Sequence, residues 1–400
     1  MALFSRKGRG LSRSESSEKN ANTADSNQPR YSAIGVDIST SAVKVLEMGR
    51  DRDGYKAINV GIEALPRDAI VERAISNIDA VGEALAVALK RSRSKRKNAI
   101  VAVASSHVVT RTIYLPAELN DNDLEEQVGL EAVHHIPYSL DEVNMDYMVI
   151  GPSAADPGEN EILLSACRRE IVEDYAGVVA SAGLQPVIID VDSFAVERAY
   201  SLVTKAFGES IQGKVIGLLD YGDTTTHLDV FVDGKIVYSR DHAFGGRILT
   251  ENIRTRFANS HEEAEAMKLA SDLPENYVAD LLEPFKASMA QEANRAIEFF
   301  ASSSRSNEGV DAIFLTGGCA AIDGATDVIQ QVTGFDTFVA NPFAGSESRR
   351  KSAALGRQTP LLFKACGLAM RGTGGEALIY CLGARSAGVS SNKCAYRWLA

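Results

Sequence analysis

An aspartate followed by a turn of glycine and threonine lies near the middle of the chain. Asp220 ends an apolar stretch, and the turn after it contains Gly222, Thr224, Thr225 and Thr226. A carboxylate can hold a hydrated magnesium ion, while turn amides and hydroxyls can face phosphate oxygens. On its own the pattern is ordinary hairpin sequence, so its meaning depends on the rest of the chain.

The same pattern occurs near the start of the sequence. Its residues are Asp37, Ser39, Thr40, Ser41 and Lys44. Lys44 would neutralise phosphate charge in such a loop. The two units together predict a phosphate clamp, with a magnesium ion between Asp37 and Asp220 that is bound through its waters, because magnesium dehydrates reluctantly.

Two glycine pairs complete the pattern. Gly245 and Gly246 precede an expected helix and would let a ligand approach the backbone closely. Gly317 and Gly318 follow an expected buried strand and could lie flat beneath a nucleobase or sugar. Each turn alone is common in α/β proteins and favours a structural role. Their order, with two of the turns inside repeated hairpins, favours a nucleotide site.

Each acid is positioned by the same series of expected elements. A strand ends in the acid, a second strand returns, and an Asp-Gly turn, Asp53-Gly54 or Asp233-Gly234, leads into a third strand. The two units lie too far apart for tandem repeats of one small motif. They predict an α/β protein of two similar domains, 31–205 and 206–371, each starting with a hairpin sheet.

A smaller unit is expected inside the first domain. Two strands within 98–115 are followed by a helix that Asn120 or Asp121 caps, strands near 145–150 and 162–167, a helix that Gly183 ends, and a strand reaching Asp190. This order predicts a small α+β subdomain inserted at about 105–187.

The composition limits the possible functions. The net charge of −11 argues against a general nucleic-acid binder, which needs a basic field to attract phosphates. An apolar run of roughly 18 residues, as a membrane helix requires, is missing, and so is the apolar core of a signal peptide, so we expect a cytoplasmic protein. The five cysteines are scattered and form no C-x-x-C pair, which favours reduced thiols.

The two ends of the chain differ from the body. Residues 1–30 are rich in serine, asparagine, lysine and arginine, and we expect a disordered basic arm. Residues 372–400 show no clear periodicity and receive no role.

Eight segments resemble the PilM family of type IV pilus assembly proteins, in the actin-like ATPase superfamily. They are IGVDISTSAVKVLEM, EAVHHIPY, LLDYGDTTTHLDVF, FGGRILTENI, LEPFKASMAQEANRAIEFF, LTGGCAAIDG, TFVANPF and ACGLAMR. The resemblance implies an actin-like fold with an FtsA-like inserted subdomain 1C, subdomains 1A, 2A and 2B, and ATP with Mg²⁺ in the cleft. It places the two acid loops and both glycine pairs in the nucleotide site, with Glu251 on the ribose side.

The resemblance also implies partners. They are the cytoplasmic N-terminal peptide of PilN, the PilN/PilO alignment complex and the pilus motor ATPases, at the cytoplasmic side of the inner membrane. It leaves a homodimer or polymer open, and implies at most a weak magnesium-dependent ATPase.

Two other functions are compatible with the same superfamily. A small-molecule kinase would need an acid as base for the acceptor hydroxyl, and Asp190 and Asp192 are the candidates, although we expect them to cap the following helix. An FtsA-like polymerising membrane tether would need a C-terminal amphipathic helix, and the tail sequence lacks its pattern.

Overall fold

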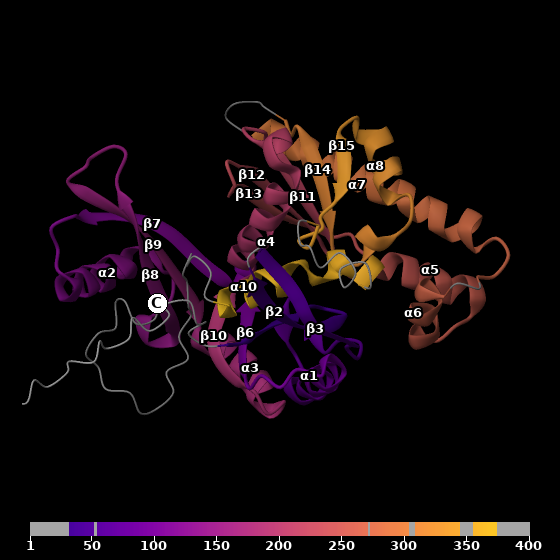
Figure 1. Cartoon of the computed structure of the whole chain (residues 1–400), viewed down its shortest axis with the longest axis horizontal. Helices are drawn as coiled ribbons and strands as arrows, with labels where there is room; N and C mark the ends of the chain where they lie inside the picture. Colours follow the sequence, from indigo (N-terminus) through magenta and orange to yellow (C-terminus); the bar gives the residue numbers. More distant parts are fainter. Residues whose placement is uncertain (1–31, 52–53, 271–272, 304–308, 345–354, 374–400) are drawn as a thin grey trace, which may run out of the picture.

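The computed structural model describes residues 32–51, 54–270, 273–303, 309–344 and 355–373. The basic arm 1–30, Cys381, Cys394 and almost all of the unassigned tail lie outside these ranges. Within them, none of the helices is both long and apolar enough to cross a membrane. Figure 1 shows two sheet-containing domains, one above the other, and a smaller unit at the left.

The first domain is built on a five-stranded sheet of order β10-β6-β1-β2-β3. The strands are β1 (Ile34–Ile38), β2 (Ala42–Asp51), β3 (Gly54–Ala64), β6 (Asn98–Val103) and β10 (Gln185–Val191). The first three are antiparallel neighbours, whereas β6 and β10 run parallel to β1. A short hairpin of β4 (Ile70–Val71) and β5 (Ala74–Ile75) lies before the first helix.

The second domain repeats this topology. Its sheet has the order β13-β12-β11-β14-β15. The strands are β11 (Ile216–Tyr221), β12 (Thr226–Val232), β13 (Lys235–His242), β14 (Ala312–Thr316) and β15 (Asp336–Val339). Again the first three strands are antiparallel and the last two run parallel to the first. The prediction of two similar domains, each opened by a hairpin sheet, is confirmed.

Helices pack against both sheets. In the first domain they are α1 (Ile78–Ser92), α3 (Arg169–Ser181) and α4 (Asp192–Phe207). In the second they are α5 (Arg247–Phe257), α6 (His261–Leu269), α7 (Glu283–Ser303), which follows a π-helical turn, and α8 (Ala325–Thr333). The last helix, α10 (Phe363–Gly372), packs on β1 and α4, so the end of the described chain returns to the first domain.

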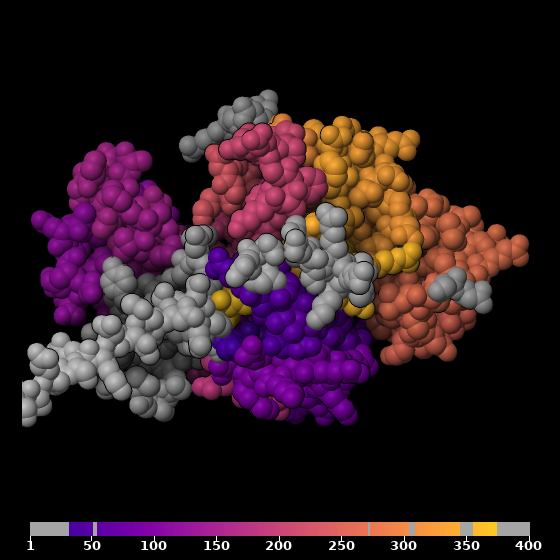
Figure 2. Space-filling view, viewed as in Figure 1, coloured from indigo at the N-terminus to yellow at the C-terminus, as the bar shows by residue number. Residues whose placement is uncertain are grey.

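The inserted unit has its own sheet and core. Strands β7 (Val108–Pro116), β8 (Val143–Pro152) and β9 (Glu159–Arg168) pair in the order β7-β9-β8, and α2 (Asp121–His135), capped by the Asn120 side chain, packs on them. It forms a separate lobe in Figure 2. The expected limits of 105–187 extend too far, because α3 packs against α1 and β10 extends the first sheet.

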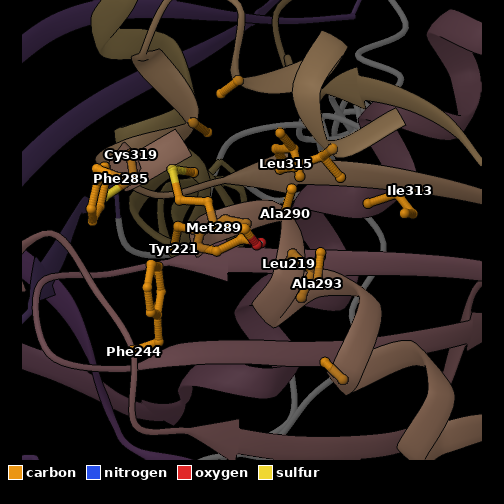
Figure 3. Close-up of a cluster of buried hydrophobic side chains, with 14 of the residues drawn as sticks. Leu219, Tyr221, Phe244, Phe285, Met289, Ala290, Ala293, Ile313, Leu315 and Cys319 are labelled. Carbon is orange, nitrogen blue, oxygen red and sulfur yellow. The ribbon is translucent and has the colours of Figure 1, made fainter. Parts of the chain in front are cut away.

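Alternation along the strands decides which way the two acids point. Leu219 and Tyr221 face α7 in the core of the second domain (Figure 3), so Asp220 lies on the opposite face of β11 together with Leu218. Val36 and Ile38 belong to the core beneath α1 and α3, so Asp37 points to the other face of β1.

The faces that carry the two acids share one neighbour, helix α10. A Cβ atom on Gly35 would lie 2.4 Å from the backbone oxygen of Ala365, which places α10 directly against β1. Leu362, Phe363 and Cys366 pack with Leu46 of the first sheet and Leu218 of the second. Helix α10 therefore lies between the two sheets, beside both acids.

Candidate functional site

The first acid loop is a turn between β1 and β2. Asp37 and Lys44 are opposite each other in the β1–β2 pairing, and the Lys44 ammonium lies 2.8 Å from Asp37 Oδ2 and 2.9 Å from Ser39 Oγ. The Ser39 amide donates to the carbonyl of Ala42, which closes the turn, and Ser41 is exposed. The loop thus presents a lysine and hydroxyl groups at the end of β1.

The second acid loop is held by the glycine pair that follows β13. The Gly246 amide donates to the Gly222 carbonyl at 2.9 Å, and a Cβ atom on Gly245 would lie 2.3 Å from the Asp223 carbonyl oxygen. The Arg247 guanidinium pairs with the Asp223 carboxylate at 2.7 Å. This close packing leaves Thr224 and Thr225 partly exposed on the loop.

Thr226 does not belong to the phosphate loop. Its hydroxyl donates to the Phe244 carbonyl at 2.9 Å, and the residue is fully buried. The prediction for this side chain is wrong, because it is the first residue of β12 and alternation turns it into the core.

Gly317 brings the third turn against the second acid. Its φ of +85° suits glycine, and a Cβ atom there would lie 2.4 Å from Asp220 Oδ1. The Gly317 amide donates to the Pro360 carbonyl at 3.1 Å, so the turn is tied to the segment that leads into α10. Gly318 beside it is exposed.

Lys364 of α10 joins the acids of the two domains. Its ammonium lies 2.8 Å from Asp220 Oδ2 and 3.8 Å from Asp192 Oδ2, and it is also attracted by Asp37. Burial raises the pKa of Asp220, but Lys364 outweighs it, with help from Lys44, and holds that pKa below its usual value. The two predicted loops therefore converge on one cluster of charges.

Residues of this cluster do not fit a magnesium ion that the two acids would ligate directly. Asp37 and Asp220 each have an oxygen 2.8 Å from a lysine nitrogen, and ammonium groups occupy the place where a cation would bind. Across the described ranges, three or more carboxylate, histidine or cysteine side chains nowhere converge as a metal site. One oxygen of each acid is thus already paired with a lysine, and a magnesium ion held between the acids through its waters stays a prediction.

Asp190 is a structural residue. It is fully buried and pairs with Arg198 and with Arg371, whose Nη1 lies 2.9 Å from Asp190 Oδ2. Neither Asp190 nor Asp192 caps α4, which begins without a side-chain cap bond, so that expectation is wrong. A fully buried carboxylate that is paired with two arginines is not accessible to an acceptor hydroxyl.

Asp192 is also neutralised. It accepts the Ser105 amide at 2.8 Å and faces Lys364 and Arg73. Burial raises the pKa of Asp192, but the two cations outweigh it, and the net pKa is lowered. A carboxylate with a lowered pKa is a poor general base, so neither candidate for a kinase base is suitable.

A known protein family matches most of this chain. The family model for type IV pilus assembly protein PilM matches residues 35–373, which span both domains and α10. The chain belongs to the PilM family.

The PilM-family fold is seen in a solved structure. A chain from a "PilM-PilN type IV pilus biogenesis complex" has a TM-score of 0.68 at 24% identity, and the match covers 86% of this chain and 99% of that one. Ethanolamine utilization protein EutJ from Carboxydothermus hydrogenoformans gives a TM-score of 0.47 at 17% identity, covering 84% and 89%. MreB 5 of Spiroplasma citri gives 0.41 at 14%, covering 85% and 94%. Only the first likeness is close enough to show the fold.

Glu251 lies at the contact between the domains of this PilM-family chain. It projects from α5, its carboxylate is 2.7 Å from Arg254 and 4.0 Å from Arg67 of the first domain, and its side chain is 41% exposed. Arg247 approaches Asp68 in the same area, at 3.9 Å. The ribose-side role of Glu251 stays a prediction.

Two cations of the site, Lys364 and Arg73, are not among the residues that the sequence predicts. Lys364 carries one recognisable signal, because it is a lone cation within the apolar run Pro360 to Met370. Arg73 carries no such signal. It lies in the turn between the two-residue strands β4 and β5, and only the tertiary fold brings it to Asp192 and Asp241.

A buried histidine extends the network into the second sheet. His227 lies against Asp241 and Asp229, with its Nε2 3.0 Å from Asp229 Oδ1, and Asp241 also binds Arg73 at 3.0 Å. Burial lowers the pKa of His227, but the two carboxylates outweigh it and, together with Asp192, raise the pKa to about 10. The charged imidazole therefore ties β12 to β13 within the second domain, and the ion pair of Asp241 with Arg73 links this network to the first domain.

This histidine makes stability depend on pH. An unfolded histidine titrates near 6.5, so the stabilisation from His227 is fully present below about pH 6.5 and is lost as the pH rises towards about 10. We expect the melting temperature to fall across that window, and less so in His227→Gln. Thermal unfolding of both proteins at several pH values is the measurement. Parallel curves for the two proteins would refute the assignment.

Proposed function

We propose that this PilM-family chain is a nucleotide-binding scaffold of type IV pilus assembly. In this proposal ATP occupies the cleft where the Asp37 and Asp220 loops meet, with Gly317 and Gly318 near the base or sugar. The observation that supports it is the convergence of both loops on Lys44 and Lys364. We assign no magnesium position, because the two acids that would hold the metal are paired with lysines.

The proposed partner is the cytoplasmic N-terminal segment of PilN. The solved PilM-PilN complex, whose chain this one resembles along most of its length, supports that choice. The PilN/PilO complex, the pilus motor and a cytoplasmic position beside the inner membrane belong to the same proposal. Nucleotide would set the relative position of the two domains and thereby the surface offered to the partner.

We propose a scaffold and not a small-molecule kinase, because Asp190 and Asp192 are both held in ion pairs. Turnover of ATP should then be slow and unaffected by sugars or polyols. Rapid phosphorylation of any such compound would contradict this. The polymerising membrane tether is not supported by any described residue, since its anchor would lie in the tail.

Retention of a pilus membrane protein tests the proposed function. The full chain is immobilised and exposed to an inner-membrane extract with and without ATP, and bound proteins are identified by mass spectrometry. A synthetic peptide of the PilN N-terminus serves as competitor. We expect PilN to be retained, to respond to ATP and to be displaced by the peptide. If PilN is retained in neither condition, the proposal fails.

A further inference from the structure

Lys364 is placed beside Asp220 by the segment that precedes α10. The carbonyl of Pro360 accepts hydrogen bonds from the Gly317 amide and, at 2.7 Å, from the Thr316 hydroxyl. These bonds fix the start of α10 next to the end of β14, which pairs with β11. The other residues from Phe363 to Met370 are buried, so the helix has little freedom to move Lys364 away.

Both oxygens of Asp220 are in close contact with protein atoms. Oδ2 binds the Lys364 ammonium at 2.8 Å. Oδ1 lies so close to Gly317 that a Cβ atom there would be 2.4 Å away. A cation that bound Asp220 Oδ2 directly would have to displace Lys364, and this would leave a buried ammonium without its strongest partner.

The carboxylates nearest to Lys364 already have cationic partners in the protein. Asp37 pairs with Lys44, Asp220 pairs with Lys364, and Asp192 faces both Lys364 and Arg73. The Lys364 side chain remains 20% exposed, so an anion at the proposed nucleotide site can reach it. An incoming polyphosphate adds negative charge, and the two lysines are the groups available to neutralise it.

We propose, on the basis of the nucleotide site proposed above, that Lys364 is a built-in counter-cation for the phosphates of a nucleoside polyphosphate. Its ammonium would neutralise phosphate charge that a divalent metal would otherwise neutralise. The affinity of this chain for such a nucleotide therefore depends little on magnesium. The charge of Lys364 is the reason.

Titration of the full chain with ATP in excess magnesium and in EDTA tests this role. For the wild type and for the surface control Lys205→Met, we expect the Kd to differ less than about threefold between the two conditions. Lys364→Met keeps the length of the side chain without its charge. We expect it to bind ATP about tenfold more weakly in EDTA and to recover when magnesium is added.

The outcomes separate this role from the nucleotide site itself. ATP binding by the wild type that strictly requires magnesium overturns the role of Lys364 and leaves the nucleotide site standing. If folded Lys364→Met binds ATP in EDTA as tightly as the wild type does, the role of Lys364 is likewise overturned and the nucleotide site stands. Absence of ATP binding in both conditions overturns both. If Lys364→Met does not fold, the Kd of the wild type for ATP in excess magnesium and in EDTA still tests the proposal.

Discussion

Asp190→Ala is expected to lower the free energy of unfolding by about 3–5 kcal/mol. The substitution leaves Arg198 and Arg371 buried without the carboxylate that both contact. Arg198 also donates to the Gly367 carbonyl of α10 at 2.9 Å, so the loss falls where α4 and α10 pack together. Denaturant unfolding, followed by circular dichroism, measures the change.

A matched control for this substitution is Glu173→Ala on the exposed side of α3, which should change stability by less than about 0.5 kcal/mol. A loss below about 1 kcal/mol for Asp190→Ala would mean that water reaches the arginines. It would also reopen a chemical role for Asp190.

Lys44→Met is expected to weaken ATP binding by about 10- to 100-fold, which is roughly 1.4–3 kcal/mol. Lys44 is the buried cation of the first loop, and methionine keeps its length while removing the charge that would meet a phosphate. Calorimetry measures the affinity, and thermal unfolding shows whether the variant is folded.

The loss of Lys44 also leaves Asp37 without its ion-pair partner. The double variant Asp37→Asn with Lys44→Met removes that unpaired charge and should be more stable than Lys44→Met alone, yet still bind ATP weakly. Lys90→Met, on the exposed end of α1, is the control. Wild-type affinity in the double variant would show that Lys44 does not contact the nucleotide.

Local patterns were sufficient to predict much of the fold. Both hairpin units, the Asn120 cap and the glycine pair before α5 follow from features a few residues apart, and the structure confirms them. The sequence also predicts the duplicated sheet. Both hairpin units have a strand that ends in an aspartate, a return strand and an Asp-Gly turn, and this repeated pattern favours the same strand order in both domains.

Features that depend on distant parts of the chain were not predictable in the same way. The approach of Lys364 to Asp220 depends on α10 lying between the two sheets, and no local spacing encodes that. The pairing of Asp190 with Arg371 is equally remote in sequence, and it replaced the expected cap. The predicted limits of the inserted unit are too wide, because the sequences of α3 and β10 do not show which sheet these two elements join.

The most direct test of the nucleotide cleft is a calorimetric titration of the full chain and of Gly245→Val with ATP. The valine would push its Cβ atom into the Asp223 carbonyl, now 2.3 Å from that position, and so displace the second loop. Gly129→Val is the control, because a Cβ atom at Gly129 in α2 meets no neighbour within 4 Å. We expect the wild type and the control to bind ATP, and Gly245→Val to bind at least about tenfold more weakly while folded. Equal affinity in all three proteins, or no binding by the wild type, would contradict a nucleotide site between the Asp37 and Asp220 loops.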